Sequence, residues 1–503
     1  MKAHVMFLAD DVLKGREAGT PEFNIAARYV AARFYAAGLR PAGDHGDYLQ
    51  TVPLVSYRVE GPGSLALDAT RFVYGEDYVP AATPRAQTRA SAPVVFVGYG
   101  IDAPGEGRDD YAGVDARGKV VAFLSGAPRG LDAELRAFLG STATKQRFAA
   151  RRGAVGVIVL PTPASERVRP FAREVANLDH ARMTWAAPDG APNLDTPDTP
   201  VLATLSPAGA AKLFGGAPTS WATVTRALKG DNPRPKPVTL KGTLTAESRS
   251  RIERVTSYNV AGLLPGSDPA VADQVVVLSA HLDHIGVTKP VNGDAINNGA
   301  LDDAIGIASL IEEAKRFQAA GAPRRSILFL AVTAEEKGLI GSDYFVEHPT
   351  VPAANIVADV NLDMPILTYR FQDVVAFGGD RSTLGPIIQR AAAGIGVTLS
   401  PDPMPDEAIF VRSDHFRFVE RGIPSVFLWP GHSGEGKAAT ELFMSTHYHR
   451  PSDDLSQPID WGQGVRFVDL NYRIARGIAD APARPVWNKG DYFGTLFGGP
   501  MAD

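Results

Sequence analysis

The chain has 503 residues, which is more than a single compact core normally holds, so at least two domains are expected. Its apolar fraction of 45% and charged fraction of 21% are ordinary for a globular protein. The net charge of -5 leaves no basic excess to neutralise phosphates, which argues against a nucleic-acid partner. Because there is no cysteine, disulfides and thiolate metal sites are excluded, and any zinc would need His, Asp and Glu ligands.

No stretch approaches the roughly 20 apolar residues that span a bilayer, so no membrane partner is expected. The N-terminal sequence MKAHVMFLADD has a short apolar run that soon meets Asp10 and Asp11, too short for the core of a signal peptide. We therefore expect either a cytoplasmic protein or, in preference, a periplasmic or secreted one whose signal peptide is absent from this chain. The sequence carries no indication of oligomeric state.

Residues 22–38 predict an amphipathic helix that stops at Gly38, followed by a short strand at 48–55. The apolar face of this helix is expected to comprise Ile25, Ala26, Val30, Phe34 and Ala37.

Between residues 60 and 245, Gly and Pro are frequent and the strand-like runs are short. These runs cover 93–97, 119–124 and 155–160, and a helix is expected at 144–152 before the last of them. The pattern predicts a small, mostly β domain. The polar, Pro-rich segment GDNPRPKP at 230–237 predicts an exit linker.

From about residue 250, strand-like apolar runs alternate with helical stretches, which predicts an α/β fold with a mixed, mostly parallel sheet between helices. The runs cover 275–278, 327–332, 356–360 and 425–428. Helical spacing relates Ile307, Ile311, Ala314 and Phe317, and again Ile387, Ala391 and Ile395. The four runs lead into SAHLDH, TAEEKG, NLDM and WPGHSG. Open α/β sheets bind ligands beyond the carboxyl ends of their strands, so we expect the functional site there.

The first candidate ligand is His281, directly after a predicted buried strand. In an extended segment Asp283 would point the same way, and could accept the second imidazole N–H or otherwise orient the ligand. An isolated HxD is more often a capped loop, but its position at a strand end favours a metal site.

Two pairs of acids follow. Helix capping explains one member of Asp302-Asp303, and the pair suits a metal-bridging carboxylate with a structural neighbour. Glu335 and Glu336 would repel each other unless a cation lay nearby. With a metal present, one Glu can bind it and the other can take a proton from water. The residues alone leave open which member of each pair has which role.

Asp363 follows an apolar strand, where an uncompensated carboxylate would be costly. His449 lies with His447 in the loop HYHRPSDD, while His432 sits in an ordinary Gly-Ser-Gly setting. Two His and three acids would make a co-catalytic dinuclear site suited to amide hydrolysis.

At these residues the chain resembles the M28 family of zinc aminopeptidases. The motifs SAHLDH, LDDAIG, TAEEKGLIGS, NLDM, RSDHFRF and HYHRPSDD occur in the family's order over about 281–454. The segments VVFVGYGI, DDYAGVDARGKVVAFLSGAP and RRGAVGVIVL resemble a protease-associated (PA) domain. The N-terminal LADDVLKGREAGTPEF resembles the opening of PA-containing members.

The resemblance implies a zinc-exopeptidase (phosphorylase/hydrolase-like) fold, with residues 1–59 and 246–485 forming the peptidase domain, 60–245 an inserted PA domain and 486–503 a C-terminal tail. It also implies two zinc ions per chain and peptide substrates. Asp302 would bridge the metals, His281 and Asp363 would complete one ligand shell, and Glu336 and His449 the other. Glu335 would be the general base, Asp283 would support His281, and Tyr448 would donate a hydrogen bond to the oxyanion.

Specificity stays open at the level of the sequence. Pro365 after NLDM and Ile305 after Asp302-Asp303-Ala304 depart from the family's pattern. Arg412, Phe410 and Trp429 are candidates for substrate contacts, although a surface Arg and buried aromatics are more common fates. The main expectation is an aminopeptidase, and the alternatives are a carboxypeptidase or dipeptidase of the same fold, a one-zinc glutaminyl cyclase, and an inactive binding protein.

Overall fold

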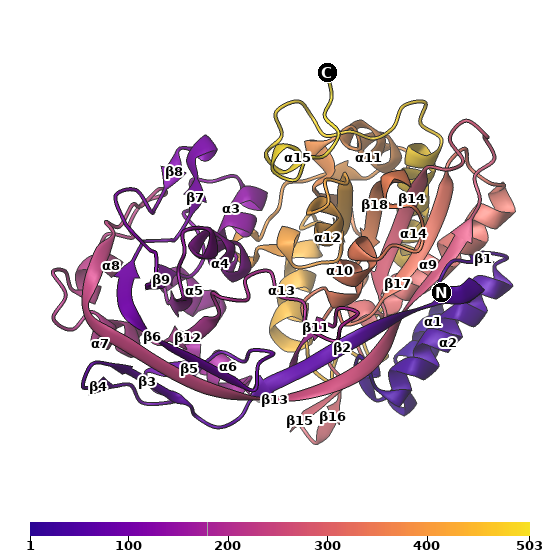
Figure 1. The fold of residues 1–503 in the computed structure, drawn as a ribbon. Coiled ribbons are helices and arrows are strands. Elements are labelled where there is room, and N and C mark those ends of the chain that lie inside the picture. Colours follow the sequence, from indigo (N-terminus) through magenta and orange to yellow (C-terminus); the bar gives the residue numbers. More distant parts are fainter. Residues whose placement is uncertain (179) are drawn as a thin grey trace. The chain divides into compact units, whose positions relative to one another are not determined.

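The computed structural model describes residues 1–178 and 180–503 and divides the chain into two compact units (Figure 1). Unit 1 comprises residues 1–54, 255–403 and 412–503, and unit 2 comprises 55–254 and 404–411. These boundaries lie a few residues from the expected ones at 59/60 and 245/246, whereas the short excursion at 404–411 was not expected. In the described part of the chain, no helix combines the length and apolar character that crossing a bilayer requires.

The chain passes between the units inside two β-strands, β2 (Leu49–Val59) and β13 (Val238–Leu264). The predicted exit linker at 230–237 is therefore wrong, because this segment belongs to unit 2. The buried Arg108 guanidinium donates to Asn232 Oδ1 at 2.9 Å and to the Pro233 carbonyl at 3.0 Å. Proline lacks a backbone donor but keeps its carbonyl oxygen, and here the Pro233 oxygen accepts a hydrogen bond from a buried cation.

Unit 1 is built on a mixed sheet whose central strands run parallel in the order β17-β14-β18-β21. Their bounds are Ser326–Val332 for β17, Val275–His281 for β14, Ile356–Leu362 for β18 and Ser425–Pro430 for β21. Every residue of these four strands is buried, which explains why parallel strands appear in sequence as continuous apolar runs. The prediction of a mostly parallel sheet is confirmed.

Other strands complete this sheet. On one side β13 pairs antiparallel with β17, and β1 (Arg40–Pro41) pairs with β13. On the other side β19 (Asp373–Phe377) pairs antiparallel with β21, and β20 (Thr398–Leu399) runs parallel to β19. A small hairpin of β15 (Val287–Val291) and β16 (Asp294–Ile296) lies in the connection after β14.

Helices cover both faces of the unit 1 sheet, as alternation along β17 shows. Phe329 meets Phe34 and Phe317 at ring-centroid distances of 6.2 Å and 6.1 Å. Its neighbours Leu328 and Leu330 pack in the core cluster that contains Phe345 and Phe418. The helices are α1 (Lys2–Leu8), α2 (Pro21–Ala36), α9 (Ile305–Ala320), α10 (Ile340–Glu347), α11 (Gly385–Ala393), α12 (His415–Val419), α13 (Gly436–Thr446), α14 (Trp461–Ala479) and α15 (Tyr492–Leu496).

Helix α2 forms where the sequence predicted a helix, with Thr20 as its N-cap accepting a hydrogen bond from the Phe23 N–H at 3.2 Å. Its buried face is Phe23, Ala26, Ala27, Val30 and Phe34. The placement of Ile25 on that face was wrong, since its side chain is 51% exposed. At 3.6 residues per turn Ile25 lies roughly 200° round the helix from Phe23.

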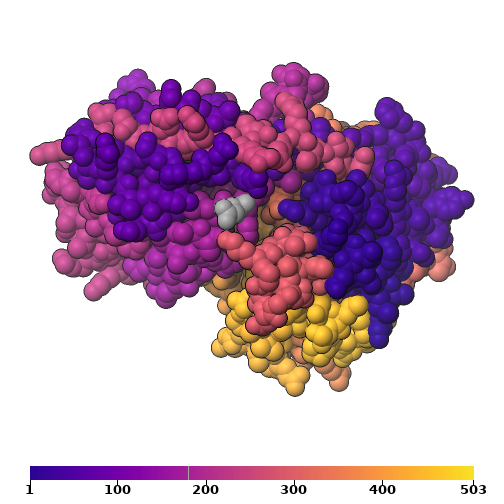
Figure 2. Space-filling view, turned by 90° about the horizontal axis from the view of Figure 1, so that it is seen from below, coloured from indigo at the N-terminus to yellow at the C-terminus, as the bar shows by residue number. Residues whose placement is uncertain are grey.

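The two ends of the chain pack onto unit 1. The Lys2 ammonium lies 5.8 Å from the centroid of the Trp461 ring, and Figure 2 shows the indigo N-terminal residues against the yellow C-terminal ones. The segment expected to be a tail, 486–503, belongs to unit 1. Trp487 is buried within it and donates its indole N–H to the Gly422 carbonyl at 2.7 Å.

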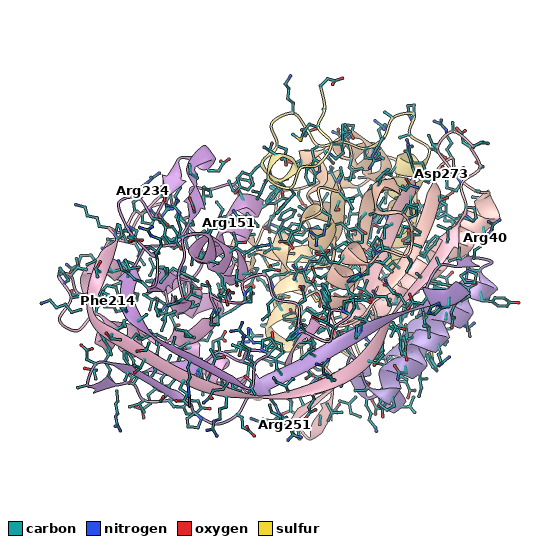
Figure 3. The ribbon with its side chains drawn as sticks, viewed as in Figure 1. Arg40, Arg151, Phe214, Arg234, Arg251 and Asp273 are labelled. Atoms are coloured by element: carbon teal, nitrogen blue, oxygen red, sulfur yellow. The ribbon has the colours of Figure 1, made fainter. Side chains whose placement is uncertain are left out.

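Unit 2 has its own sheet, in which β6, β9, β10 and β12 run parallel and β13, β3 and β5 lie antiparallel at the sides. The strands that lie wholly within unit 2 are β3 (Ser64–Leu67), β4 (Thr70–Arg71), β5 (Tyr78–Pro80), β6 (Gln87–Phe96), β7 (Asp102–Ala103), β8 (Arg108–Asp109), β9 (Val120–Leu124), β10 (Gly156–Leu160), β11 (Arg182–Trp185) and β12 (Val201–Leu205). Of these, β7 and β8 form a separate two-stranded sheet. Its helices are α3 (Ala133–Gly140), α4 (Thr142–Arg151), α5 (Pro163–Val168), α6 (Phe171–Ala176), α7 (Pro207–Leu213) and α8 (Trp221–Arg226). Phe214, labelled in Figure 3, packs on Phe96 and Trp221 at centroid distances of 5.3 Å and 5.4 Å.

Candidate metal centre

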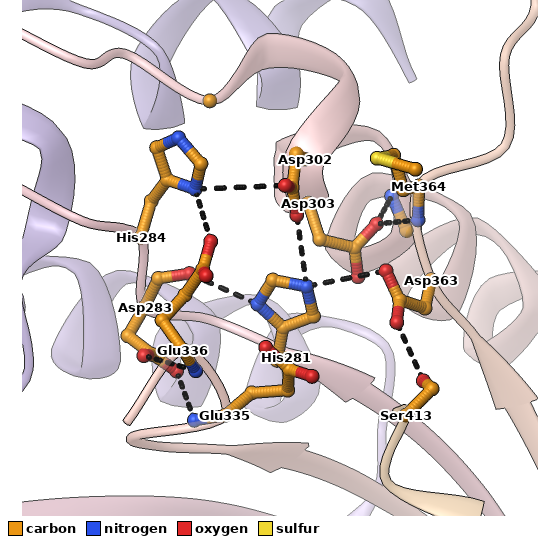
Figure 4. A network of polar contacts seen from close by, with 12 residues as sticks. His281, Asp283, His284, Asp302, Asp303, Glu335, Glu336, Asp363, Met364 and Ser413 are labelled. Carbon is orange, nitrogen blue, oxygen red and sulfur yellow. Dashed lines mark hydrogen bonds and ion pairs between the residues drawn. The ribbon is translucent and has the colours of Figure 1, made fainter. Parts of the chain in front are cut away.

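The predicted polar residues meet at the carboxyl edge of the parallel strands. His281 ends β14 and pairs in register with Val332, the last residue of β17. Glu335 and Glu336 follow β17 closely, and Asp363 directly follows β18. Since parallel strands end at one edge of a sheet, the side chains converge there, as Figure 4 shows.

One group of ligand atoms surrounds His281. Its Nε2 lies 3.1 Å from Asp302 Oδ1 and 3.3 Å from Asp363 Oδ1. Its Nδ1 lies 3.0 Å from the backbone oxygen of Asp283. A carbonyl oxygen only accepts, so Nδ1 carries the proton of that bond and Nε2 faces the two carboxylates. This is the orientation that a metal-binding imidazole adopts.

A second group surrounds Glu336. His449 Nε2 lies 3.0 Å from Glu336 Oε2 and 3.3 Å from Asp302 Oδ2. His284 approaches the same carboxylates, with its Nδ1 2.7 Å from Glu336 Oε1 and 3.9 Å from Asp302 Oδ2. Asp302 therefore presents one oxygen to each group.

The two members of the Asp302-Asp303 pair point in different directions. The Asp303 Oδ1 accepts the N–H groups of Gly306 and Met364, both at 3.0 Å. It therefore caps the start of α9 and fixes the residue after Asp363. Asp302 lies in the π-helical turn Ala300–Ala304, and its backbone N–H donates to Asp453 Oδ2 at 3.0 Å. The geometry thus favours Asp302 as the bridging residue.

Asp283 contacts His281 through its backbone and the two glutamates through its side chain, so of the two roles considered its carboxylate does not have that of imidazole acceptor. Its backbone oxygen takes His281 Nδ1, while its carboxylate accepts the N–H groups of Glu335 at 3.0 Å and Glu336 at 3.3 Å. Burial raises the pKa of Asp283 to about 7. Asp283 thereby fixes the backbone that carries both glutamates.

The loop of HYHRPSDD separates its two histidines. His447 Nδ1 lies 3.0 Å from Ser452 Oγ and 2.9 Å from Gln457 Nε2, so it is engaged within its own loop. His449, by contrast, reaches the two carboxylates. The Arg412 guanidinium donates to the Tyr448 hydroxyl oxygen at 3.1 Å, and the ring of Tyr448 lies 3.9 Å from that of His449.

The two aromatic candidates for substrate contacts are buried. Phe410 belongs to unit 2 and is 1% exposed. Trp429 is 4% exposed and donates its indole N–H to the Met364 carbonyl at 2.5 Å. Both therefore act as packing residues in the structure, as buried aromatics usually do.

The electrostatics of the site indicate a need for positive charge. Burial would lower the pKa of His281, yet Glu335, Asp363 and Asp302 together raise that pKa well above the usual value. The His449 imidazole is likewise buried, and Glu336 and other neighbours raise its pKa well above normal. Burial raises the pKa of Glu335 well above its usual value, and the neighbouring carboxylates of Asp363 and Glu336 raise it further. An excess of buried carboxylates is stable only with cations nearby.

The donor set fits zinc. Two sets of ligand atoms lie mutually within 4.8 Å, one from His281, Asp302 and Asp363 and the other from His284, Asp302 and Glu336. All donors are imidazole nitrogens or carboxylate oxygens, which suit zinc when thiolates are absent. Glu336 Oε1 and both nitrogens of His284 are buried and lack a hydrogen-bond partner, as expected where a cation would complete the contacts.

His284 is the residue that sequence reasoning missed. It was visible in SAHLDH as a second His three residues after His281, but it was not assigned a role. Its side chain is fully buried. The signal that could have found it is the repeat of His at a strand end, in a chain with only ten His residues.

Comparison with known proteins finds similarity to zinc peptidases for the part of the chain that carries this cluster of His and carboxylate residues. Residues 259–475 match the model of peptidase family M28. Leupeptin-inactivating enzyme 1 of Streptomyces exfoliatus is 33% identical over 248 residues, covering 47% of this chain and 49% of that protein. The probable leucine aminopeptidase 2 of Aspergillus oryzae is 29% identical over 224 residues, covering 41% and 42%. The chain thus spans about half the length of the curated relatives it matches.

Among solved structures, the aminopeptidase from Aneurinibacillus sp. strain AM-1 superposes with a TM-score of 0.53 at 19% identity, covering 96% of this chain and 93% of that one. This likeness extends over nearly the whole chain and shows a shared fold. Residues 259–475 are thus similar in sequence to peptidase family M28, and the strand-edge cluster of His and carboxylate side chains lies within that matched range.

Proposed function

We propose that the chain is a co-catalytic dizinc aminopeptidase that releases N-terminal residues from peptides. The observation that carries this proposal is the position of Asp302, with Oδ1 toward His281 and Oδ2 toward His449. Such a shared carboxylate is what a two-metal site requires. In the proposed set, His281 and Asp363 hold one zinc, Glu336 and His449 hold the other, and Asp302 bridges them.

Zinc bound in this set supplies Lewis acidity, which polarises a peptide carbonyl and makes a water molecule in the site more acidic. Glu335 is proposed to take a proton from that water and to return it to the leaving amine. Its backbone is held by the hydrogen bond from its N–H to Asp283 Oδ1, so the carboxyl group starts from a fixed turn. Burial raises the pKa of Glu335 above the ordinary value of a carboxyl group, which makes it a stronger base than an exposed glutamate.

Tyr448 is proposed to stabilise the oxyanion. The guanidinium of Arg412 has only donors, so the phenol oxygen must be the acceptor of their 3.1 Å hydrogen bond. The hydroxyl proton of Tyr448 is then directed away from Arg412 and is available to a developing negative charge. Arg412 is therefore proposed to position Tyr448, which gives it a role other than contact with a substrate carboxylate.

The decisive experiment combines metal analysis with two substrates. The wild-type chain should bind two zinc ions and cleave aminoacyl amides with a free N-terminus, but not their N-acetylated forms. Glu335→Gln should retain both zinc ions and lose activity, whereas Glu441→Gln, an exposed side chain in α13, is the matched control and should change neither.

The outcomes also separate the alternatives. Equal cleavage of the blocked and free amides would refute the aminopeptidase assignment, whereas a carboxypeptidase or dipeptidase requires a free C-terminal carboxylate and should cleave unprotected peptides but neither amide. One zinc per chain without peptidase activity would favour a glutaminyl cyclase, and zinc binding without any activity a binding protein. Full activity of Glu335→Gln with two zinc ions bound would refute the assigned general base.

Unit 2 is proposed to be the PA-like domain that residues 60–245 resemble. Its proposed role is to restrict which peptides reach the site. Point substitutions confined to its surface should then change the cleavage of long peptides more than the cleavage of small amides, and an identical effect on both would contradict that role.

A further inference from the structure

His284 is a buried side chain without an assigned role, and it lies against the residues of the second ligand group. The side chain is fully buried, and neither ring nitrogen has a hydrogen-bond partner. Removing the polar nitrogens of an imidazole from water without such partners destabilises the fold, so the position of His284 needs an explanation. Packing alone would have been served by an apolar residue.

The contact with Glu336 is close but is not a hydrogen bond. His284 Nδ1 lies 2.7 Å from Glu336 Oε1, yet both atoms remain without a hydrogen-bond partner. The ring N–H direction therefore does not point at the oxygen, although the atoms are within reach. A nitrogen and an oxygen that lie close together without forming a hydrogen bond can instead both bind one metal ion. Figure 4 shows His284 directed toward both Glu336 and Asp302.

The distances lie on both sides of those expected between ligands of one metal ion. Zinc binds nitrogen and oxygen at about 2.0–2.2 Å in tetrahedral geometry, which places neighbouring ligand atoms roughly 3.3–3.6 Å apart. Around Glu336 and Asp302 the separations from His284 Nδ1 are 2.7 Å and 3.9 Å. Those from His449 Nε2 are 3.0 Å and 3.3 Å. The rings are edge-to-face with centroids 5.6 Å apart, so both can approach one point without overlapping.

We propose that His284 is a ligand of the second metal position, which is then held by two imidazoles, His284 and His449, and two carboxylates, Asp302 and Glu336. This inference rests on the proposed dizinc site and deepens it. The two positions become unequal, because the first has three protein side chains, His281, Asp302 and Asp363, and the second has four. Four protein ligands close a tetrahedral zinc site, whereas three leave a position open.

Unequal ligand sets predict unequal affinities. The first zinc added to the metal-free chain should occupy the four-ligand position, and the second should bind more weakly at the three-ligand position. X-ray absorption of the wild-type chain with one equivalent of zinc should then show two imidazoles per metal. This measurement requires no substitution and so does not depend on how a variant folds.

Two variants test the assignment directly. His284→Ala and His284→Asn should weaken the tighter zinc at least 100-fold and leave the weaker one within about threefold. They should also lower the number of imidazoles on that zinc from two to one. The matched control is His348→Asn, an exposed His at the end of α10, which should change neither affinity.

The failure of this inference is distinguishable from failure of the proposed function. Two zinc ions and full peptidase activity, with one imidazole on the tighter metal and unchanged affinities in both variants, would overturn the role of His284 alone. A loss of affinity without a change in imidazole number would also overturn it, since His284 would then only orient Glu336. If the wild-type chain bound no zinc, the dizinc proposal itself would fall.

Discussion

Arg16 connects the start of the chain to the metal centre, and replacing it tests how the site is held. Its side chain is 1% exposed and lies in the 3-10 segment Asp11–Arg16. The guanidinium donates to the carbonyls of Leu282 at 2.9 Å, Asn298 at 2.5 Å and Gly299 at 3.2 Å, and to that of Leu8. The carbonyls of Leu282, Asn298 and Gly299 belong to the segments that lead away from His281 and into Asp302, and that of Leu8 ends α1.

The magnitude follows from these contacts. Burial lowers the pKa of Arg16 to about 10, so the guanidinium remains charged at neutral pH. A hydrogen bond from a charged donor contributes about 1.5–3 kcal/mol, and removing one partner of a buried ionic arrangement costs about 3–5 kcal/mol. Arg16→Met keeps most of the apolar volume but removes the charged donor that four carbonyls share. We expect its free energy of unfolding to fall by about 3–5 kcal/mol.

Zinc affinity should fall as well, by about 10- to 100-fold, because residues that orient metal ligands typically have effects of that size. Urea denaturation of the metal-free chain and competition with a chelator measure the two quantities. The control is Arg108→Met, since Arg108 is 2% exposed and holds backbone of unit 2 in a similar way. It should lose stability and keep the zinc affinity. A loss below about 1 kcal/mol for Arg16→Met, or equal weakening of zinc by both variants, would refute this account.

Three further predictions concern single side chains. Tyr448→Phe should lower kcat by about 10²–10³ with zinc content unchanged, because one oxyanion donor is removed, and a normal kcat would exclude that role. Asp303→Ala should reduce the free energy of unfolding by about 1–3 kcal/mol, because the N–H groups of Gly306 and Met364 lose their acceptor. The variant should still bind two zinc ions, and loss of one zinc would contradict the assignment of Asp303 as a cap. Burial lowers the pKa of Lys145 in unit 2 to about 7, so the folded chain binds fewer protons there than the unfolded chain between pH 7 and 10, and stability should rise with pH over that interval. Lys145→Met should remove this slope, and an unchanged slope in urea midpoints would refute the shift.

The fold of unit 1 could be predicted because its determinants are local. The four central strands are buried on both faces, so each appears in the sequence as an uninterrupted apolar run that a helix pattern follows. The passage between the units could not be predicted in this way. Residues 247–254 of β13, ESRSRIER, are rich in charge and resemble an exposed loop, yet they continue one strand of 27 residues.

In the candidate metal centre, too, some features could be predicted from local sequence and others could not. Residue types and strand ends were enough to indicate a His and carboxylate site, but not to choose between Asp302 and Asp303. That choice depends on which carboxylate meets the N–H groups of Gly306 and Met364, and such contacts between distant segments leave no periodic trace. Arg16 was unrecognisable for a related reason, since a charged side chain is ordinarily exposed and only the folded loops provide its acceptors.

The residues of the proposed zinc site come from segments far apart in the sequence, so the site can bind metal only when all of those segments are present and folded. The proposed ligands stand at positions 281, 284, 302, 336, 363 and 449, and the residues that hold them extend from Arg16 to Asp453. A growing chain can therefore assemble the site only after almost all of unit 1 has been synthesised and folded. Free zinc at 100 times its dissociation constant would then add about 2.7 kcal/mol to the stability of the finished domain and nothing to an incomplete one. Zinc would in this way stabilise only those molecules in which all of these segments are present and folded.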